Sequence, residues 1–156
     1  MKTMQHLFAT CCLVLWWFVP QNVAAQGHYS FPLKDSTRQY VRLLFAGDAM
    51  QHSVQFKWAW DAKNRQYDYE PNFRYLRPYM ADADVSLVNF ETTLSGKPYG
   101  GYPKFRTPDA FFGALVDAGF QIFALANNHI LDGDKRGMQR TLRKMSAYPT
   151  MGAYRD

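Results

Sequence analysis

The chain has 156 residues, of which 47% are hydrophobic, 17% aromatic and 20% charged, and its net charge is +5. This length suits a single domain, and the apolar content excludes a chain that is disordered over most of its length. Two cysteines cannot build a disulfide-stapled miniprotein. The modest, scattered excess of basic residues favours an anionic partner and argues against nucleic-acid binding.

The N-terminus has the three parts of a secretory signal peptide. Lys2 precedes an apolar run at residues 7–19, which is shorter than the roughly 20 residues that a membrane-spanning helix needs. Small residues then lead up to Ala25, as a signal peptidase requires. We therefore predict a signal peptide over residues 1–25 and an exported protein. The alternative is an uncleaved segment, which would be the only membrane contact that we expect; cleavage would remove both cysteines.

The rest of the chain alternates short apolar runs with helical patterns. Residues 26–40 are polar and show no period, which is typical of a leader or linker. Strands are predicted at 41–45, 85–88 and 122–126. Helices are predicted around 73–80, 107–119 and 138–145. This alternation predicts an α/β fold, a layered sandwich with parallel strands joined by right-handed crossovers.

Two of the predicted helices rest on specific signals. In the first, Phe73, Leu76 and Tyr79 or Met80 share one face. In the second, Thr107 is the expected N-cap, Pro108 takes the first helical position and Gly119 ends the helix.

Polar residues that can bind metals follow each predicted strand. They are Asp48 and His52 after the first, Asn89 and Glu91 after the second, and Asn127, Asn128, His129 and Asp132 after the third. In open α/β sheets the carboxyl ends of the strands are where ligands bind. Mixed oxygen and nitrogen donors suit Zn, Mn or Fe better than Ca or Mg. Two such ions would activate water for hydrolysis of phosphate or amide bonds.

Each group also has a purely structural interpretation. Gly-Asp after a strand is often a turn, and the Asn-Asn pair tolerates left-handed backbone. Asn89 and Glu91 could cap a turn, and His52 or His129 could simply pack locally. Asp132-Gly133-Asp134 resembles a turn without the spacing of a calcium loop. The coincidence of all three groups at strand ends favours function.

Several motifs together resemble a known family. They are residues 45–50 (FAGDAM), 83–92 (ADVSLVNFET), 105–108 (FRTP), 118–120 (AGF) and 126–132 (ANNHILD), followed by Gly137, residues 141–142 and residues 152–153. In this order they resemble the CapA family of poly-γ-glutamate capsule biosynthesis proteins, which is part of the calcineurin-like metallophosphatase superfamily. The resemblance covers residues 41–153, nearly all of the chain after the predicted signal peptide.

The resemblance implies roles for individual residues. Asp48, Glu91 and Asn128 would be metal ligands for one or two divalent transition metal ions (Mn, Fe or Zn), and His129 would act in catalysis at the substrate phosphate. Further candidates for metal or substrate contact are His52, Asn89, Asn127 and Asp132. Arg106, in the FRTP motif, is a candidate substrate residue. The superfamily's first motif has a histidine where this chain has Met50.

A complete domain of this family is about twice as long, so residues 41–156 are expected to be its N-terminal half and to be inactive alone. The intact protein would be exported across the inner membrane, to the periplasm, the cell surface or the medium. It would hydrolyse a phosphoester or the γ-glutamyl amide of an exported polymer. The alternative is a non-catalytic export or anchoring factor that binds a polyanion and works with other capsule biosynthesis proteins. An aromatic-basic stretch at residues 56–69, with Trp58 and Trp60 as candidate substrate contacts, supports it unless that stretch simply packs.

Overall fold

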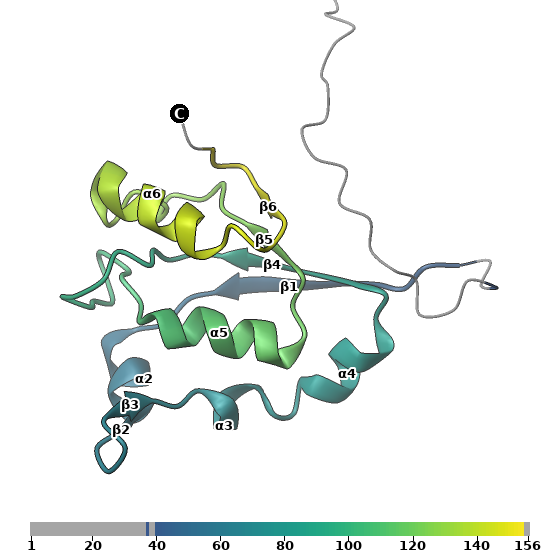
Figure 1. Cartoon of the computed structure of the whole chain (residues 1–156), viewed down its shortest axis with the longest axis horizontal. Helices are drawn as coiled ribbons and strands as arrows, with labels where there is room; N and C mark the ends of the chain where they lie inside the picture. Colours follow the sequence, from purple (N-terminus) through teal and green to yellow (C-terminus); the bar gives the residue numbers. More distant parts are fainter. Residues whose placement is uncertain (1–36, 38–39, 155–156) are drawn as a thin grey trace, which may run out of the picture. The chain divides into compact units, whose positions relative to one another are not determined.

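The computed structural model describes residue 37 and residues 40–154; the predicted signal peptide and nearly all of the predicted leader lie outside them. Its main sheet has the strand order β1-β4-β5-β6, and all neighbouring strands are parallel (Figure 1). The strands are β1 (Leu43–Ala49), β4 (Val85–Phe90), β5 (Ile122–Ala124) and β6 (Thr150–Met151). The predicted α/β fold with alternating strands and helices is confirmed, and it is consistent with a metallophosphatase-like architecture.

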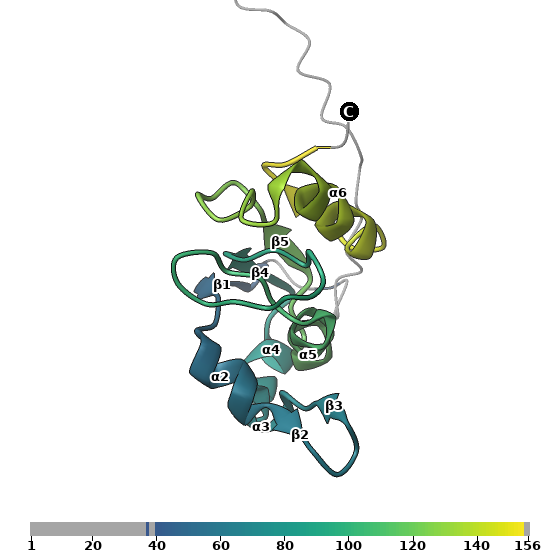
Figure 2. The same ribbon diagram turned by 90° about the vertical axis from the view of Figure 1, so that its left-hand side faces the viewer.

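Helices follow the strands in sequence. They are α2 (Ser53–Trp58), α3 (Glu70–Phe73), α4 (Arg77–Asp82), α5 (Asp109–Ala118) and α6 (Asp134–Lys144). A small antiparallel hairpin, β2 (Trp60–Asp61) and β3 (Gln66–Tyr67), follows α2. The strand order runs in one direction, and right-handed crossovers therefore place their helices on one side of the sheet. Figure 2 shows α5 and α6 on the same side.

The core lies between the helices and this side of the sheet. Phe90 of β4 is fully buried, and its ring centroid lies 6.1 to 6.4 Å from those of Phe111, Phe112 and Phe123. Leu115 of α5 is buried against the same cluster. Alternate residues of a strand point to opposite faces, so β4 shows a regular half-buried, buried pattern.

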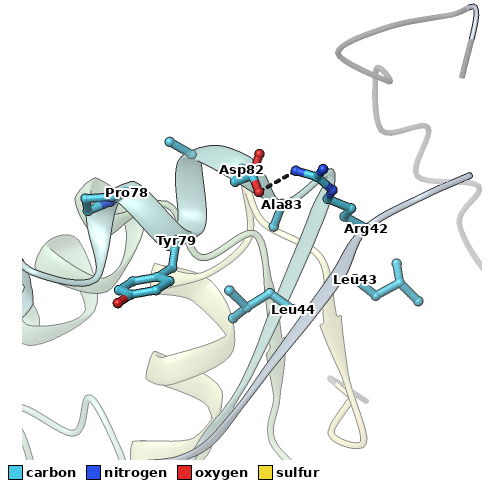
Figure 3. Close-up of a pocket in the computed structure, with 8 residues that line it drawn as sticks. Arg42, Leu43, Leu44, Pro78, Tyr79, Asp82 and Ala83 are labelled. Carbon is cyan, nitrogen blue, oxygen red and sulfur yellow. Dashed lines mark ion pairs between the residues drawn. The ribbon is translucent and has the colours of Figure 1, made fainter.

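The other face of the sheet is largely uncovered by the described residues. Phe45 is 69% exposed and Leu43 is 58% exposed, and their partners in β4, Leu87 and Val85, are half-buried. A cavity of about 810 Å³ opens where β1 begins, between that strand and α4 (Figure 3). Its lining residues are Arg42, Leu43, Leu44, Pro78, Tyr79, Ala81, Asp82 and Ala83.

Two helix predictions need correction. The pattern at residues 73–80 forms two short helices, α3 and α4, instead of one, and only Met80 of its predicted face is buried. The cap of α5 is Pro108, and the hydroxyl of Thr107 instead accepts a hydrogen bond from Gln51 Nε2 at 2.8 Å. The predicted end of α5 is confirmed at Gly119, whose φ of 111° lies in the left-handed region that favours glycine.

An ion pair links α5 to α6. Arg140 donates two hydrogen bonds to the Asp109 carboxylate, at 2.7 and 2.8 Å, and Lys144 lies 3.0 Å from it. Burial would raise the pKa of Asp109, but the hydrogen bonds from Arg140 and Lys144 outweigh burial and lower this pKa. A lowered pKa stabilises the fold above the unfolded value of about 3.9 and loses that effect as the pH falls through the folded value.

We expect Asp109→Asn to lower the free energy of unfolding by about 1 kcal/mol at pH 7, a modest loss because the Asp109 side chain is 39% exposed. At a second, acidic pH below the lowered folded-state pKa of Asp109, the loss should fade because the wild-type carboxylate also becomes neutral. Urea unfolding at both pH values measures it. Asp117→Asn, on an exposed position of the same helix, is the control. An equal loss at both pH values would contradict the assignment to charge.

Candidate functional site

A β-bulge brings the ends of β1 and β4 together. Ala46 pairs with Val88 and Asp48 pairs with Asn89, so Gly47 is an extra residue in β1. A bulge re-aims the side chain that follows it. Here Asp48 lies beside Asn89, whose Nδ2 donates to Asp48 Oδ1 at 2.9 Å. Asp48 is thus inside β1, whereas the sequence predicted that it follows the strand.

The end of β4 extends this contact towards β5. Asn89 Nδ2 also donates to Glu91 Oε2 at 2.7 Å. Asn127, in the loop after β5, donates from Nδ2 to Asn89 Oδ1 and to the Phe90 carbonyl, both at 3.0 Å. The ends of three parallel strands therefore share one hydrogen-bonded network, as the sequence predicted from their spacing.

His129 adds an oriented imidazole to this network. Its backbone N–H donates to Asn127 Oδ1 at 3.1 Å, and its ring Nδ1 lies 2.8 Å from Asp132 Oδ2. Because an ionised carboxylate only accepts hydrogen bonds, the hydrogen is assigned to Nδ1. The opposite nitrogen, Nε2, lies 3.0 Å from Asn128 Nδ2 and 4.0 Å from Glu91 Oε1. We call the set Asp48, Asn89, Glu91, Asn127, Asn128, His129 and Asp132 the strand-end cluster.

The negative charges of Asp48 and Glu91 lie close together and repel each other. The Glu91 side chain is 15% exposed. Burial, followed by the hydrogen bond and negative charge of Asp48, raises the pKa of Glu91, and His129 and Asn89 offset only part of that rise. Such a pair is stabilised by a shared proton or by a cation.

The donor types of the cluster fit the predicted transition metal: three carboxylates, an imidazole and three amides. In this structure the donor groups are hydrogen-bonded to one another. Asn89 bonds to the carboxylates of Asp48 and Glu91, and Asp132 bonds to Nδ1 of His129. In the part of the chain that the structure describes, no three His, Cys, Asp or Glu side chains are grouped so as to hold a metal ion.

Other predicted site residues lie beside the cluster or apart from it. His52 is the N-cap of α2, and its ring packs on Phe105 at 5.1 Å between centroids. Arg106 leaves its Nε buried without a hydrogen-bond partner among the described atoms. Trp58, at the end of α2, is 85% exposed, and Trp60, in β2 of the hairpin, is 43% exposed. The aromatic-basic stretch is therefore partly packed, as at the buried Tyr69, and partly exposed.

Phe105 supports the site in a way that the sequence analysis missed. This residue is 3% exposed, and the His129 ring packs against it edge-on at 4.6 Å between centroids. Its backbone N–H donates to Asp132 Oδ2 at 2.5 Å, which fixes the carboxylate that holds His129. The only sequence signal for Phe105 is its place in the FRTP motif, because an aromatic residue in a loop belongs to no helical or strand periodicity.

A family model matches most of the chain. The model for the bacterial capsule synthesis protein PGA_cap matches residues 42–156, nearly all of the described part. The chain belongs to this family. The predicted CapA relationship is thereby confirmed, and the family supports a role in capsule synthesis. None of the curated proteins matches the chain.

No helix among the described residues is both long and apolar enough to cross a membrane.

Proposed function

We propose that this capsule synthesis protein is exported and that the intact protein is a metal-dependent hydrolase. Its substrate would be a phosphoester or the γ-glutamyl amide of an exported anionic polymer. The signal-peptide pattern of residues 1–25 supports export. The observation that carries the proposal is the strand-end cluster, which unites carboxylates, amides and an imidazole from three strand ends.

Asp48 and Glu91 would hold the divalent metal, with the side-chain oxygens of Asn89 or Asn128 as further ligands. A bound metal of this kind supplies Lewis-acid activation of water and of the scissile group. His129 would hold or move a proton at Nε2, the nitrogen that faces the cluster. Asp132 would keep the ring in this orientation through Nδ1.

Metal content tests the proposal. The intact protein, loaded with Mn, Fe or Zn and dialysed, is expected to retain near-stoichiometric metal by elemental analysis. The double variant Asp48→Asn/Asn128→Ala should lose it, because it removes one charge and one amide ligand from the cluster. Asp117→Asn removes a carboxylate from an exposed position of α5 and should retain the metal. Equal metal content in the double variant and the wild type would overturn the proposal.

A second candidate function is non-catalytic binding of a polyanion, in partnership with other capsule biosynthesis proteins. The exposed Trp58 and Trp60 favour it, because they lie next to basic residues that form no ion pairs among the described residues. Metal-free protein should then bind polyglutamate in a salt-sensitive manner. No retention at low salt would count against this function.

A further inference from the structure

A second cavity lies apart from the strand-end cluster, beside the hairpin. It has a volume of about 310 Å³, and we call it the lysine cleft. Its lining residues are Phe56, Lys57, Trp60, Tyr67 and Lys97. They come from α2, from both strands of the hairpin and from the loop between β4 and α5. Both views of the fold show α2 and the hairpin next to each other (Figures 1 and 2). Segments distant in sequence thus build one cleft.

Aromatic contacts fix the walls of the lysine cleft. The rings of Trp60 and Tyr67 meet edge-on at 5.0 Å between centroids. Behind them, Tyr99 contacts Tyr67 at 5.7 Å and Phe56 at 6.3 Å. Phe56 is 9% exposed and belongs to the main core. The apolar walls are therefore held by the fold, which lowers the ordering cost that a ligand meets on binding.

The cleft carries positive charge that the described residues do not neutralise. Within residues 40–154, neither Lys57 nor Lys97 forms an ion pair. Asp61, the carboxylate of the hairpin, is hydrogen-bonded within its own turn. It accepts hydrogen bonds from the backbone of Lys63 and Asn64, and from Asn64 Nδ2 at 2.5 Å. Two ammonium groups beside apolar walls are left for a ligand.

We infer that the lysine cleft binds a segment of an acidic polymer whose carboxylates are separated by methylene groups. The two lysines would pair with carboxylates, and Trp60 and Tyr67 would cover the methylene groups between them. A chain with equal charge but no apolar spacers, such as polyphosphate, leaves these aromatic walls without a partner. The inference rests on the second candidate function and gives that function a location outside the strand-end cluster.

The test uses the full chain, a chelator to remove metal, and a fluorescently labelled glutamate oligomer of about ten residues at low salt. Fluorescence anisotropy is expected to show binding by the wild type and weaker binding, by roughly tenfold, for Lys57→Gln/Lys97→Gln. Arg136→Gln/Arg143→Gln removes the same charge from exposed positions of α6 and should change the Kd by less than about twofold. Equal weakening by both double variants would overturn the inference, because the polymer would then sense only net charge.

The aromatic wall is tested by two aromatic residues that differ in position. Trp60→Ala should weaken binding, whereas Tyr75→Ala, at a side chain that is 77% exposed and outside the lining, should not. Trp60→Phe keeps an aromatic ring in the hairpin and so controls for unfolding of the hairpin in Trp60→Ala. It should bind the glutamate oligomer more tightly than Trp60→Ala does. Polyphosphate of equal charge binding as tightly as the glutamate oligomer would overturn the carboxylate assignment. Binding that survives every cleft variant rejects the cleft but keeps the polyanion function, whereas no binding by the wild type rejects both.

Discussion

Phe90→Ala is expected to lower the free energy of unfolding by about 3–5 kcal/mol, a large share of the total stability of a domain of this size. Phe90 is fully buried at the centre of an aromatic cluster that joins β4 and β5 to α5. Removal of its ring deletes buried apolar surface and leaves a cavity that rigid aromatic neighbours cannot close. The same residue precedes Glu91, so the change also loosens the end of β4.

Chemical denaturation of the full chain measures this loss, with Phe45→Ala as the matched control. Phe45 lies on the uncovered face of the sheet and is 69% exposed. Because its ring is already in contact with water, its removal should cost less than about 0.5 kcal/mol. A larger loss for Phe45→Ala than for Phe90→Ala would mean that the helices do not cover the assigned face.

The sheet and its connections could be predicted because their signal is local. Apolar runs near Val85 and Ile122 mark strands, and the glycine at 119 marks a helix end by its backbone alone. The sequence also predicted that Asn89 and Asn127 lie close together, since parallel neighbouring strands end at one edge of the sheet. These features depend on periodicity and topology, which a single sequence records.

Other features depend on contacts between distant residues. The bulge at Gly47 is set by the pairing of β1 with β4, so strand bounds read from Val41 to Phe45 stopped short of Asp48. Thr107 looked like a helix cap because its partner, Gln51, is 56 residues away. The role of Asp132 as a holder of His129 likewise appears only when the loop around Phe105 is in place.

Burial and the neighbouring Asp48 raise the pKa of Glu91, and we therefore expect Glu91→Gln to have effects of opposite sign on stability and on metal binding. The raised pKa of Glu91 means that its protonated form stabilises the fold. This stabilisation is complete below the unfolded pKa of about 4.3 and is lost as the pH rises through the folded value. At neutral pH and without metal, the neutral amide that Glu91→Gln introduces should therefore make the variant more stable than the wild type. The difference should vanish below about pH 4, where the wild-type carboxyl is also neutral.

Added transition metal should reverse this order if Glu91 is a ligand. A metal at 100 times its Kd stabilises the wild type by about 2.7 kcal/mol, and Glu91→Gln should weaken the affinity by at least about 100-fold and lose most of that gain. Thermal unfolding with and without Mn or Zn, at pH 7 and pH 4, measures both effects. Glu70→Gln, at an exposed position of α3, should follow the wild type in all four conditions. A different result is that metal stabilises Glu91→Gln as much as it stabilises the wild type, although the variant is more stable without metal. That result would contradict the assignment of Glu91 as a metal ligand.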